Sequence, residues 1–195
     1  MNNHQEPFDI FSKWIKIAQE NSKIIEPTAM CLATVDKENR PSSRMILLKK
    51  FDEKGFCFFT NLNGRKAGEL KNNQNVALCF YWGVLGRQIR IEGSVENVTQ
   101  KEADDYFSSR QRGSQIGAWA SKQSEEMAND QEFAQRIEKF EKEFAEKDVS
   151  RPPFWSGFRC IPSRIEFWEE GEFRLHKRTI YQKSGDSWII SNIYP

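Results

Sequence analysis

The fold is indicated most clearly by the stretch Asn75-Val76-Ala77-Leu78-Cys79-Phe80-Tyr81-Trp82, which a short turn at Gly83–Gly86 connects to Arg87–Val95. The first segment is rich in β-branched and aromatic residues, which favour extended backbone. A turn this short leads one strand directly into an antiparallel neighbour. We therefore predict two adjacent strands of an antiparallel sheet at this point.

Segments of the same kind occur before and after this stretch. They are predicted as strands at Ala29–Val35, Ser42–Lys50, Phe56–Thr60, Phe154–Ile161, Arg164–Glu169, Phe173–Gln182 and Trp188–Tyr194. Consecutive short strands with tight turns are typical of an antiparallel sheet that curls into a barrel. Because β segments flank the helical ones, we expect a single mainly β domain with peripheral helices over residues 1–195.

Helix signals interrupt the β pattern in four places, through apolar residues at helical spacing or through N-terminal caps. The predicted helices are Pro7–Lys23, a short one from Arg65 to just before Asn75 with Asn63 as N-cap, one starting at the capping box of Thr99 and Glu102, and Asp130–Lys147. The segment Ile116–Asn129 is mixed and polar, and no element is assigned to it.

Length and composition describe a globular chain of 195 residues, with 38% hydrophobic residues, 29% charged residues and a net charge of +1. This charge gives no broad basic field of the kind that binds nucleic acid, so any anion site must be local. No apolar run reaches the length of a transmembrane helix, and residues 1–9 lack the layout of a signal peptide. We therefore expect a cytoplasmic protein that binds neither nucleic acid nor membranes.

The cysteines and histidines argue against a metal site. The four cysteines form no CxxC pair, and three lie in apolar strand-like segments, so we expect reduced, buried thiols. The two histidines are His4 and His176. A structural zinc site needs clustered ligands, and we expect no metal.

Two cations open the short second helix, where Arg65 and Lys66 occupy the first turn. Free N–H groups and the helix dipole favour anions at that end, so basic residues there are unfavourable unless an anion is bound. A phosphate held by the N–H groups and both side chains would remove the conflict. The alternative is an exposed pair that costs some tenths of a kcal/mol.

A second set of phosphate donors follows the capping box. Tyr106, Arg110 and Ser114 are spaced at i, i+4 and i+8, and they would share one face if the helix continued. Gly113 is expected to end or bend that helix, which leaves the place of Ser114 open. Two hydroxyls and a guanidinium suit a phosphate. The alternative is a solvated polar stripe.

A third set of basic side chains lies in the predicted strand Phe173–Gln182. Alternation along a strand would place Arg174, His176 and Arg178 on one face. Three such groups in line repel one another unless an anion lies along them. The alternative is a charged edge strand that protects the sheet from aggregation.

Several motifs together resemble the pyridoxamine 5′-phosphate oxidase family, over nearly all of the chain from Phe8 onward. They occur in the family's order and are Arg44-Met45-Ile46-Leu47-Leu48-Lys49, Phe59-Thr60-Asn61, Gly64-Arg65-Lys66-Ala67, Ser114-Gln115-Ile116-Gly117-Ala118-Trp119, Ser121-Lys122-Gln123-Ser124, Ile165-Glu166-Phe167-Trp168, Arg174-Leu175-His176 with Arg178, and Ile193-Tyr194-Pro195.

The resemblance implies a split β-barrel homodimer that binds flavin mononucleotide (FMN) at two subunit-interface sites. It implies oxidation of pyridoxine 5′-phosphate or pyridoxamine 5′-phosphate to pyridoxal 5′-phosphate by molecular oxygen, with hydrogen peroxide as by-product and ammonia from the amine. The implied FMN contacts are Arg44, Met45, Ile46, Leu47, Leu48, Lys49, Phe59, Thr60, Arg65, Lys66, Gln88, Gln123, Ser124, Trp168 and Arg178. The implied substrate contacts are Lys49, Tyr106, Arg110, Ser114, Arg174 and His176.

Within that resemblance, Arg174 and His176 are the predicted catalytic residues. Arg174 would cover the substrate ring opposite the flavin, which supplies the redox chemistry. Histidine side chains titrate near neutral pH, so His176 is the proton-transfer candidate. The rival interpretation is a split-barrel protein that binds flavin or haem without turnover. Such a protein would not need Tyr106, Arg110 and Arg174 together.

Three features need separate mention. Arg44 and Lys49 are five residues apart, so a regular strand would send them to opposite faces unless a bulge or strand end intervenes. Members of the family often carry an N-terminal arm with an Arg and a Tyr that close over the substrate, and residues 1–6 contain neither, so we expect no lid from them. Phe59 stands where Tyr is frequent.

Overall fold

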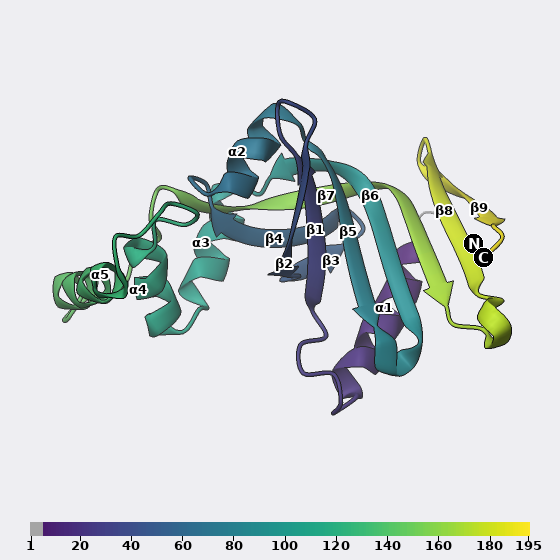
Figure 1. Cartoon of the computed structure of the whole chain (residues 1–195), viewed down its shortest axis with the longest axis horizontal. Coiled ribbons are helices and arrows are strands. Elements are labelled where there is room, and N and C mark those ends of the chain that lie inside the picture. The colour runs from purple at the N-terminus through teal and green to yellow at the C-terminus, as the bar shows by residue number, and fades with distance from the viewer. Residues whose placement is uncertain (1–5) are drawn as a thin grey trace.

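The computed structural model describes residues 6–195, in which one antiparallel sheet dominates. Its strand order is β2-β1-β5-β6-β7-β4-β3, and β8 pairs with both β7 and β9. The strands are β1 (Ala29–Val35), β2 (Pro41–Leu47), β3 (Lys50–Asp52), β4 (Gly55–Asn61), β5 (Asn75–Trp82), β6 (Arg87–Asn97), β7 (Trp155–Glu169), β8 (Lys177–Ser184) and β9 (Ser187–Asn192). The sheet curls as predicted (Figure 1).

The predicted pair at residues 75–95 forms the centre of this sheet. Strand β5 pairs with β6 in register from Asn75 opposite Ser94 to Trp82 opposite Arg87. Alternate β5 side chains are buried, as period-two patterning requires. The connection is a 3₁₀ turn, η1 (Gly83–Leu85), followed by Gly86 with a φ of 57°. Glycine adopts this left-handed conformation without steric cost, which allows the sharp return.

Strand β7 is a single 15-residue strand rather than the two predicted. The prediction was wrong because Pro162 and Ser163 look like a break, whereas a register shift between Glu92 and Gly93 absorbs the extra residue as a bulge. Along its other edge, β7 pairs first with β4 and then, beyond the bulge, with β8. Two separate strands therefore share one long edge, and the sheet splits there.

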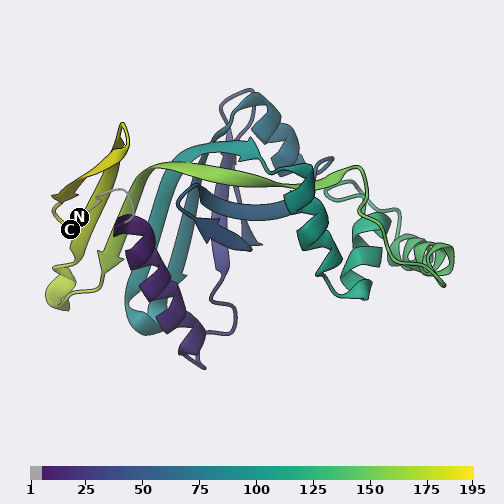
Figure 2. The same ribbon diagram turned by 180° about the vertical axis from the view of Figure 1, so that it is seen from behind.

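The N-terminal helix α1 (Glu6–Glu20) covers one face of the sheet (Figure 2). Its apolar stripe is buried, and the Phe11 ring lies 4.8 to 5.3 Å from the rings of Phe51, Phe56 and Phe80. This is the helical periodicity expected from the sequence. Aromatic rings from three strands thus form the main core around one helix.

The remaining helices are α2 (Arg65–Asn72), α3 (Gln100–Ser108), α4 (Arg112–Ala120) and α5 (Asp130–Glu143). The capping box at Thr99 and Glu102 is confirmed. Two predictions were wrong. The N-cap of α2 is Gly64 rather than Asn63. Helix α4 begins at Arg112, although the sequence predicted that the preceding helix would end near Gly113 and that no further element would follow before Asn129. Helix α5 ends at Glu143, before the predicted Lys147.

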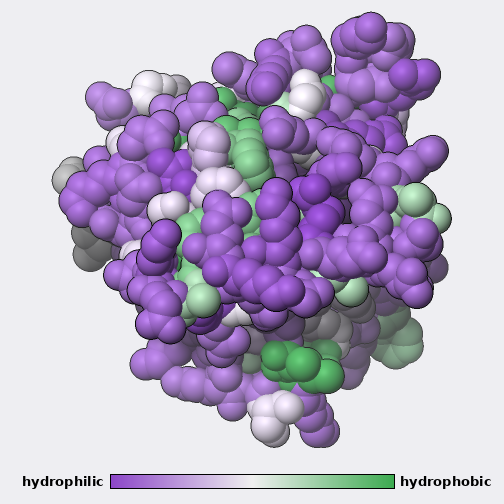
Figure 3. All heavy atoms as spheres, turned by 90° about the vertical axis from the view of Figure 1, so that its left-hand side faces the viewer, coloured by the Kyte–Doolittle hydropathy of each residue, from purple (hydrophilic) through white to green (hydrophobic). Residues whose placement is uncertain are grey.

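Helices α3 to α5 form a second layer at one end of the molecule, and β8 and β9 lie at the opposite end (Figure 1). A smaller core of Phe107, Ile116, Phe144, Val149 and Trp155 joins these helices to the start of β7. Polar side chains cover most of the surface at this end (Figure 3). Within residues 6–195, no helix is both long enough and apolar enough to cross a membrane.

The predicted strand Phe173–Gln182 begins only at Lys177, so its first residues require correction. Phe173 and Arg174 belong to a 3₁₀ turn, η2 (Glu172–Arg174), and have φ values of 54° and 65°. Left-handed backbone is strained for residues with a Cβ. The predicted row of three basic groups on one strand face is therefore wrong, because only Arg178 lies within β8.

Candidate active site

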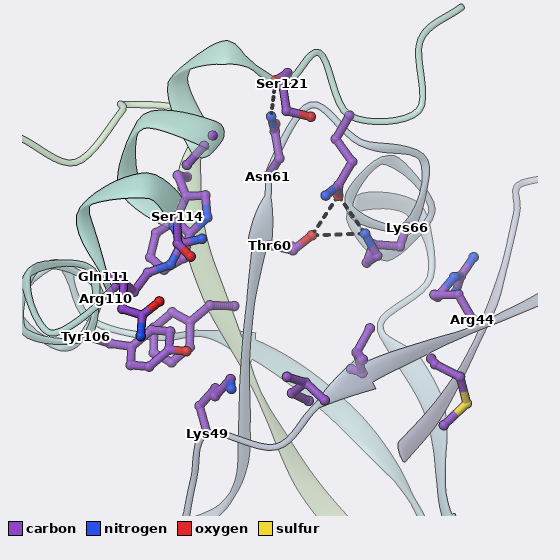
Figure 4. Close-up of a pocket in the computed structure, with 18 residues that line it drawn as sticks. Arg44, Lys49, Thr60, Asn61, Lys66, Tyr106, Arg110, Gln111, Ser114 and Ser121 are labelled. Atoms are coloured by element: carbon purple, nitrogen blue, oxygen red, sulfur yellow. Dashed lines mark hydrogen bonds between the residues drawn. The ribbon is translucent and has the colours of Figure 1, made fainter. Parts of the chain in front are cut away.

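A cavity of about 680 Å³ opens between the sheet and the α3–α4 layer. Elements distant in sequence contribute its walls, which are Arg44, Met45, Ile46, Leu47, Lys49, Phe59, Thr60, Asn61, Lys66, Tyr106, Arg110, Gln111, Ser114, Gly117, Ala118, Ser121, Gln123 and Trp155. Figure 4 shows Arg44 and Lys66 on one side of it and Tyr106, Arg110 and Ser114 on the other. The structure thus brings Lys66 from the first predicted phosphate site, and all three residues of the second, to one cavity.

Arg44 and Lys49 both line this cavity because a strand ends between them. Strand β2 stops at Leu47 and β3 starts at Lys50, so the face alternation is interrupted. The backbone N–H of Leu48 donates to Thr28 O at 2.9 Å, and that of Lys49 donates to Cys57 O at 2.9 Å. The expected strand end is therefore confirmed. Leu48, a predicted FMN contact, is instead buried in the main core.

Lys66 is the centre of a polar triangle on the α2 side. Its Nζ donates to Thr60 Oγ1 at 3.0 Å and to Gln123 Oε1 at 2.6 Å, and Thr60 Oγ1 donates to Gln123 at 3.0 Å. Burial and the nearby Arg44 charge lower the pKa of the Lys66 ammonium. An anion bound beside Lys66 would stabilise the charged ammonium and so oppose the lowering of its pKa by burial and by Arg44.

A buried carboxylate, Glu69, lies behind Arg44. Its side chain is 5% exposed and accepts hydrogen bonds from Thr34 Oγ1 at 2.5 Å, Ser42 Oγ at 2.9 Å, Arg44 Nη2 at 3.1 Å and Arg65 Nε at 2.8 Å. Burial alone would raise its pKa, but these hydrogen bonds outweigh burial and lower it to about 2. Glu69 is therefore ionised at neutral pH and anchors two arginines.

Tyr106, Arg110 and Ser114 reach the other side from two helices. Tyr106 lies on α3, Ser114 lies on α4, and Arg110 lies in the connection between them. The Arg110 guanidinium lies 4.9 Å from the Trp155 ring centroid, and its Nη1 is buried without a hydrogen-bond partner among the described residues. Burial lowers its pKa. An unpaired buried donor facing a cavity fits an anionic ligand.

Stacked rings form part of the cavity wall on the α3–α4 side. Phe59 stacks on Tyr106 at a centroid distance of 4.2 Å and on Trp155 at 5.4 Å. Phe59 therefore keeps the ring even though it lacks the hydroxyl of the family's frequent Tyr. Trp155 was not predicted as a site residue, because an aromatic residue at the start of a strand is usually part of the hydrophobic core.

Other cavity residues were also absent from the predicted contacts. Asn61 and Ser121 stand within the quoted motifs, and Asn61 Nδ2 donates to Ser121 O at 3.2 Å. That position in a shared motif was the signal that could have identified them. Gln111, Gly117 and Ala118 line the cavity through α4 and its N-cap, and no capping side chain marks the start of that helix.

Two predicted FMN contacts lie beside the cavity rather than in its wall. Arg65 is at the first turn of α2, with its side chain 62% exposed and its Nε on Glu69. Ser124 lines an adjacent pocket of about 300 Å³ and has a φ of 73°.

Five predicted residues lie elsewhere in the chain, near the end of β7: Gln88, Trp168, Arg174, His176 and Arg178. Gln88 pairs with Trp168, which pairs with Arg178 across the sheet. The His176 ring lies 4.5 Å from the Trp168 ring, and its Nδ1 accepts the Gly171 N–H at 3.3 Å. None of the five lines the 680 Å³ cavity, and β8 lies at the opposite end of the sheet from α3–α5 (Figure 1).

The cavity chemistry fits FMN and a second phosphorylated ligand. Four lining residues are cationic, namely Arg44, Lys49, Lys66 and Arg110, and no carboxylate is among the described lining residues. The aromatic wall suits flat rings, and the cations on two opposite sides of the cavity suit two phosphates. The residues present therefore fit the group that the resemblance implies.

Two family profiles match the chain. One, described as pyridoxamine 5′-phosphate oxidase, covers residues 17–143, and the other, described as the pyridoxine 5′-phosphate oxidase C-terminal dimerisation region, covers residues 155–195. Two relatives, each named pyridoxine/pyridoxamine 5′-phosphate oxidase, come from Wolbachia pipientis wMel and Psychromonas ingrahamii. The first is 50% identical over 98% of this chain and 88% of its own, and the second is 47% identical over 97% and 87%.

A solved structure, PhzG from Burkholderia lata 383 in complex with tetrahydrophenazine-1-carboxylic acid, superimposes with a TM-score of 0.91. It is 28% identical and the match covers 97% of this chain and 92% of that one. Together with the curled, split sheet, this likeness identifies the fold as the split β-barrel expected from the sequence. On the profiles and relatives, the chain belongs to the pyridoxamine 5′-phosphate oxidase family.

Proposed function

We propose that this protein is an FMN-dependent oxidase that converts pyridoxine 5′-phosphate or pyridoxamine 5′-phosphate to pyridoxal 5′-phosphate. The alcohol substrate and oxygen give the aldehyde and hydrogen peroxide, and the amine substrate also consumes water and releases ammonia. The observation that carries the proposal is one cavity with cationic groups on two opposite sides and no carboxylate among its described lining residues. Two phosphorylated ligands, cofactor and substrate, account for both sides.

The α2 side holds the cofactor phosphate. Lys66, Arg44 and Arg65 neutralise it, and Thr60 and Gln123, which already bond to Lys66, complete the polar surroundings. FMN, when bound, supplies the two-electron redox chemistry, which amino-acid side chains do not provide. The protein contributes position and electrostatics.

The α3–α4 side holds the substrate phosphate. Arg110 supplies the unpaired buried N–H, and the hydroxyls of Tyr106 and Ser114 complete the site. Lys49, at the strand end, lies between the two sides and contacts both ligands. Holding the substrate phosphate on this side would orient the reacting carbon towards the cofactor, which is a large part of catalysis.

The remaining site residues come from a second copy of the chain. Trp168 and Arg178 contact FMN and Gln88 lies beside them, while Arg174 covers the substrate ring and His176 exchanges a proton at its phenolic oxygen. These residues do not line the cavity of their own chain, and four of them lie in the 155–195 segment that matches a dimerisation region. We infer a two-fold symmetric homodimer with two composite sites.

The test is to purify the protein, record flavin absorbance, and follow hydrogen peroxide after adding pyridoxine 5′-phosphate or pyridoxamine 5′-phosphate in air. We expect a yellow protein that forms peroxide and pyridoxal 5′-phosphate in equal amounts. The rival, a flavin or haem carrier without turnover, predicts a coloured protein and no peroxide. A protein that binds neither flavin nor haem would contradict both.

A further inference from the structure

Glu69 is a buried carboxylate that bonds to two arginines beside the cavity. It is not among the residues that line the cavity, yet it bonds to two of the three cations assigned to the cofactor phosphate. A carboxylate close to a phosphate is electrostatically unfavourable by itself. Its presence therefore requires a compensating role.

The contacts of Arg44 indicate that role. Its Nη2 donates to Glu69 and to Ser42 Oγ, and its Nη1 donates to Leu32 O at 3.3 Å and to Thr34 Oγ1. Thr34 and Ser42 in turn donate to Glu69. The carboxylate is thus the shared acceptor of a closed network from β1, β2 and α2, and this network sets the orientation of the guanidinium.

Arg65 depends on Glu69 in a simpler way. Its Nε bonds to Glu69 one turn further along α2, and its side chain is otherwise largely exposed. An exposed arginine without such a partner samples many rotamers, and ordering it costs free energy when a ligand binds. Glu69 removes part of that cost in advance.

The net charge of this group of side chains also matches that of a phosphate. Arg44, Arg65 and Lys66 together with Glu69 leave a surplus of two positive charges. A phosphate monoester carries about −1.5 to −2 near neutral pH. The group therefore neutralises one phosphate without a large excess.

We propose that Glu69 is a positioning residue that presets Arg44 and Arg65 for the cofactor phosphate. The proposal rests on FMN being the cofactor, as proposed above. The change in FMN affinity that it predicts on removal of the Glu69 charge is opposite to the change that simple electrostatics predicts. Removal of a mere negative charge would tighten phosphate binding, whereas removal of a positioning group weakens it.

The experiment compares FMN with riboflavin, which lacks the phosphate, in titrations of the apoprotein followed by flavin fluorescence. We expect Glu69→Gln to bind FMN at least about tenfold more weakly, a loss of one charge-assisted contact, and to bind riboflavin as the parent does. Glu69→Asp, which keeps the charge but withdraws the carboxylate, should also lose FMN affinity. Glu138→Gln, which breaks an exposed ion pair on α5, is the matched control.

A second comparison shows whether Glu69 acts through Arg65. In a double-mutant cycle, Glu69→Gln should cost less FMN affinity in an Arg65→Ala background than in the parent, because Glu69 then positions only Arg44. Unchanged or tighter FMN binding by Glu69→Gln would overturn the proposal, as would equal losses for FMN and riboflavin, which indicate general damage to the fold. Failure of the parent itself to bind FMN would instead contradict the proposed function.

Discussion

Two buried carboxylates, Glu69 and Glu166, organise arginines in opposite halves of the molecule. Glu69 is 5% exposed and shares its bonds between hydroxyls and two arginines. Glu166 is 1% exposed and lies among three arginines, with Arg178 at 2.8 Å, Arg164 at 3.3 Å and Arg90 at 3.5 Å. Burial would raise the pKa of Glu166, but the Arg178 hydrogen bond and the three arginine charges outweigh it and lower that pKa.

The two clusters differ in what they face. The Glu69 cluster adjoins a cavity formed by its own chain, whereas the Glu166 cluster lies on β6, β7 and β8, away from that cavity (Figure 1). Predicted cofactor contacts occur in both. Under the proposed function, one chain builds the phosphate end of each site, and the region of the Glu166 cluster contributes the residues that contact the flavin ring to the site of a second subunit.

The first prediction concerns the acid dependence of the stability that Glu69 provides, and it has the largest expected effect. The folded-state pKa of Glu69 is lowered from 4.5 to about 2, so its stabilisation is complete above pH 4.5 and is lost as pH falls towards 2. This amounts to roughly 3 kcal/mol. Urea unfolding of the apoprotein should show the parent's advantage over Glu69→Gln shrinking from pH 5 to pH 2. A constant difference across that range would contradict the assignment.

The second prediction concerns Arg178, which Glu166 holds in place. Arg178→Ala should weaken FMN binding about ten- to a hundredfold, the loss of one charge-assisted contact, and leave much of the preparation colourless. Arg90→Ala is the matched control, because it removes another partner of Glu166 without removing a predicted FMN contact. Equal losses of FMN in both variants would mean that Arg178 acts through the fold alone.

The third prediction concerns Arg174, which lies in the strained turn before β8. Arg174→Ala should keep its flavin and lose about tenfold in kcat/KM, or about 1.4 kcal/mol of transition-state stabilisation. Steady-state kinetics and an FMN titration on the same preparation measure both. If Arg174→Ala lost flavin while Arg178→Ala retained it, the placement of the two ligands along this segment would be reversed.

Local sequence signals predicted much of the sheet. Ala29–Val35 and Asn75–Trp82 have the predicted bounds, and the capping box at Thr99 starts a helix. In each case the signal is contained within a few neighbouring residues. The cationic first turn of α2 also predicts an anion site, because Arg65 and Lys66 conflict with the helix dipole, and this stays a prediction.

Features that depend on tertiary contacts were not predictable. Phe173 and Arg174 adopt positive φ without glycine, so nothing local marks the turn that breaks the basic row. From the sequence, Glu69 would form an exposed ion pair with Arg65 at i, i+4. Only its burial against β1 and β2 shows that it also accepts hydrogen bonds from those strands. The N-terminal lid expectation falls partly on residues 1–5, outside the described residues.

The most direct test of the composite site is complementation between two variants expected to bind FMN weakly, Lys66→Ala in the cavity and Arg178→Ala in the C-terminal segment, assayed at an FMN concentration that saturates the parent but leaves each variant alone inactive. The variants carry different affinity tags, and the mixed dimer is isolated through both. Each mixed dimer then contains one site with both defects and one intact site. We predict about half of the parent activity, as one of two symmetric sites is restored. A mixed dimer as inactive as the two variants alone would show that both residues serve the same site from one chain, and would contradict the account.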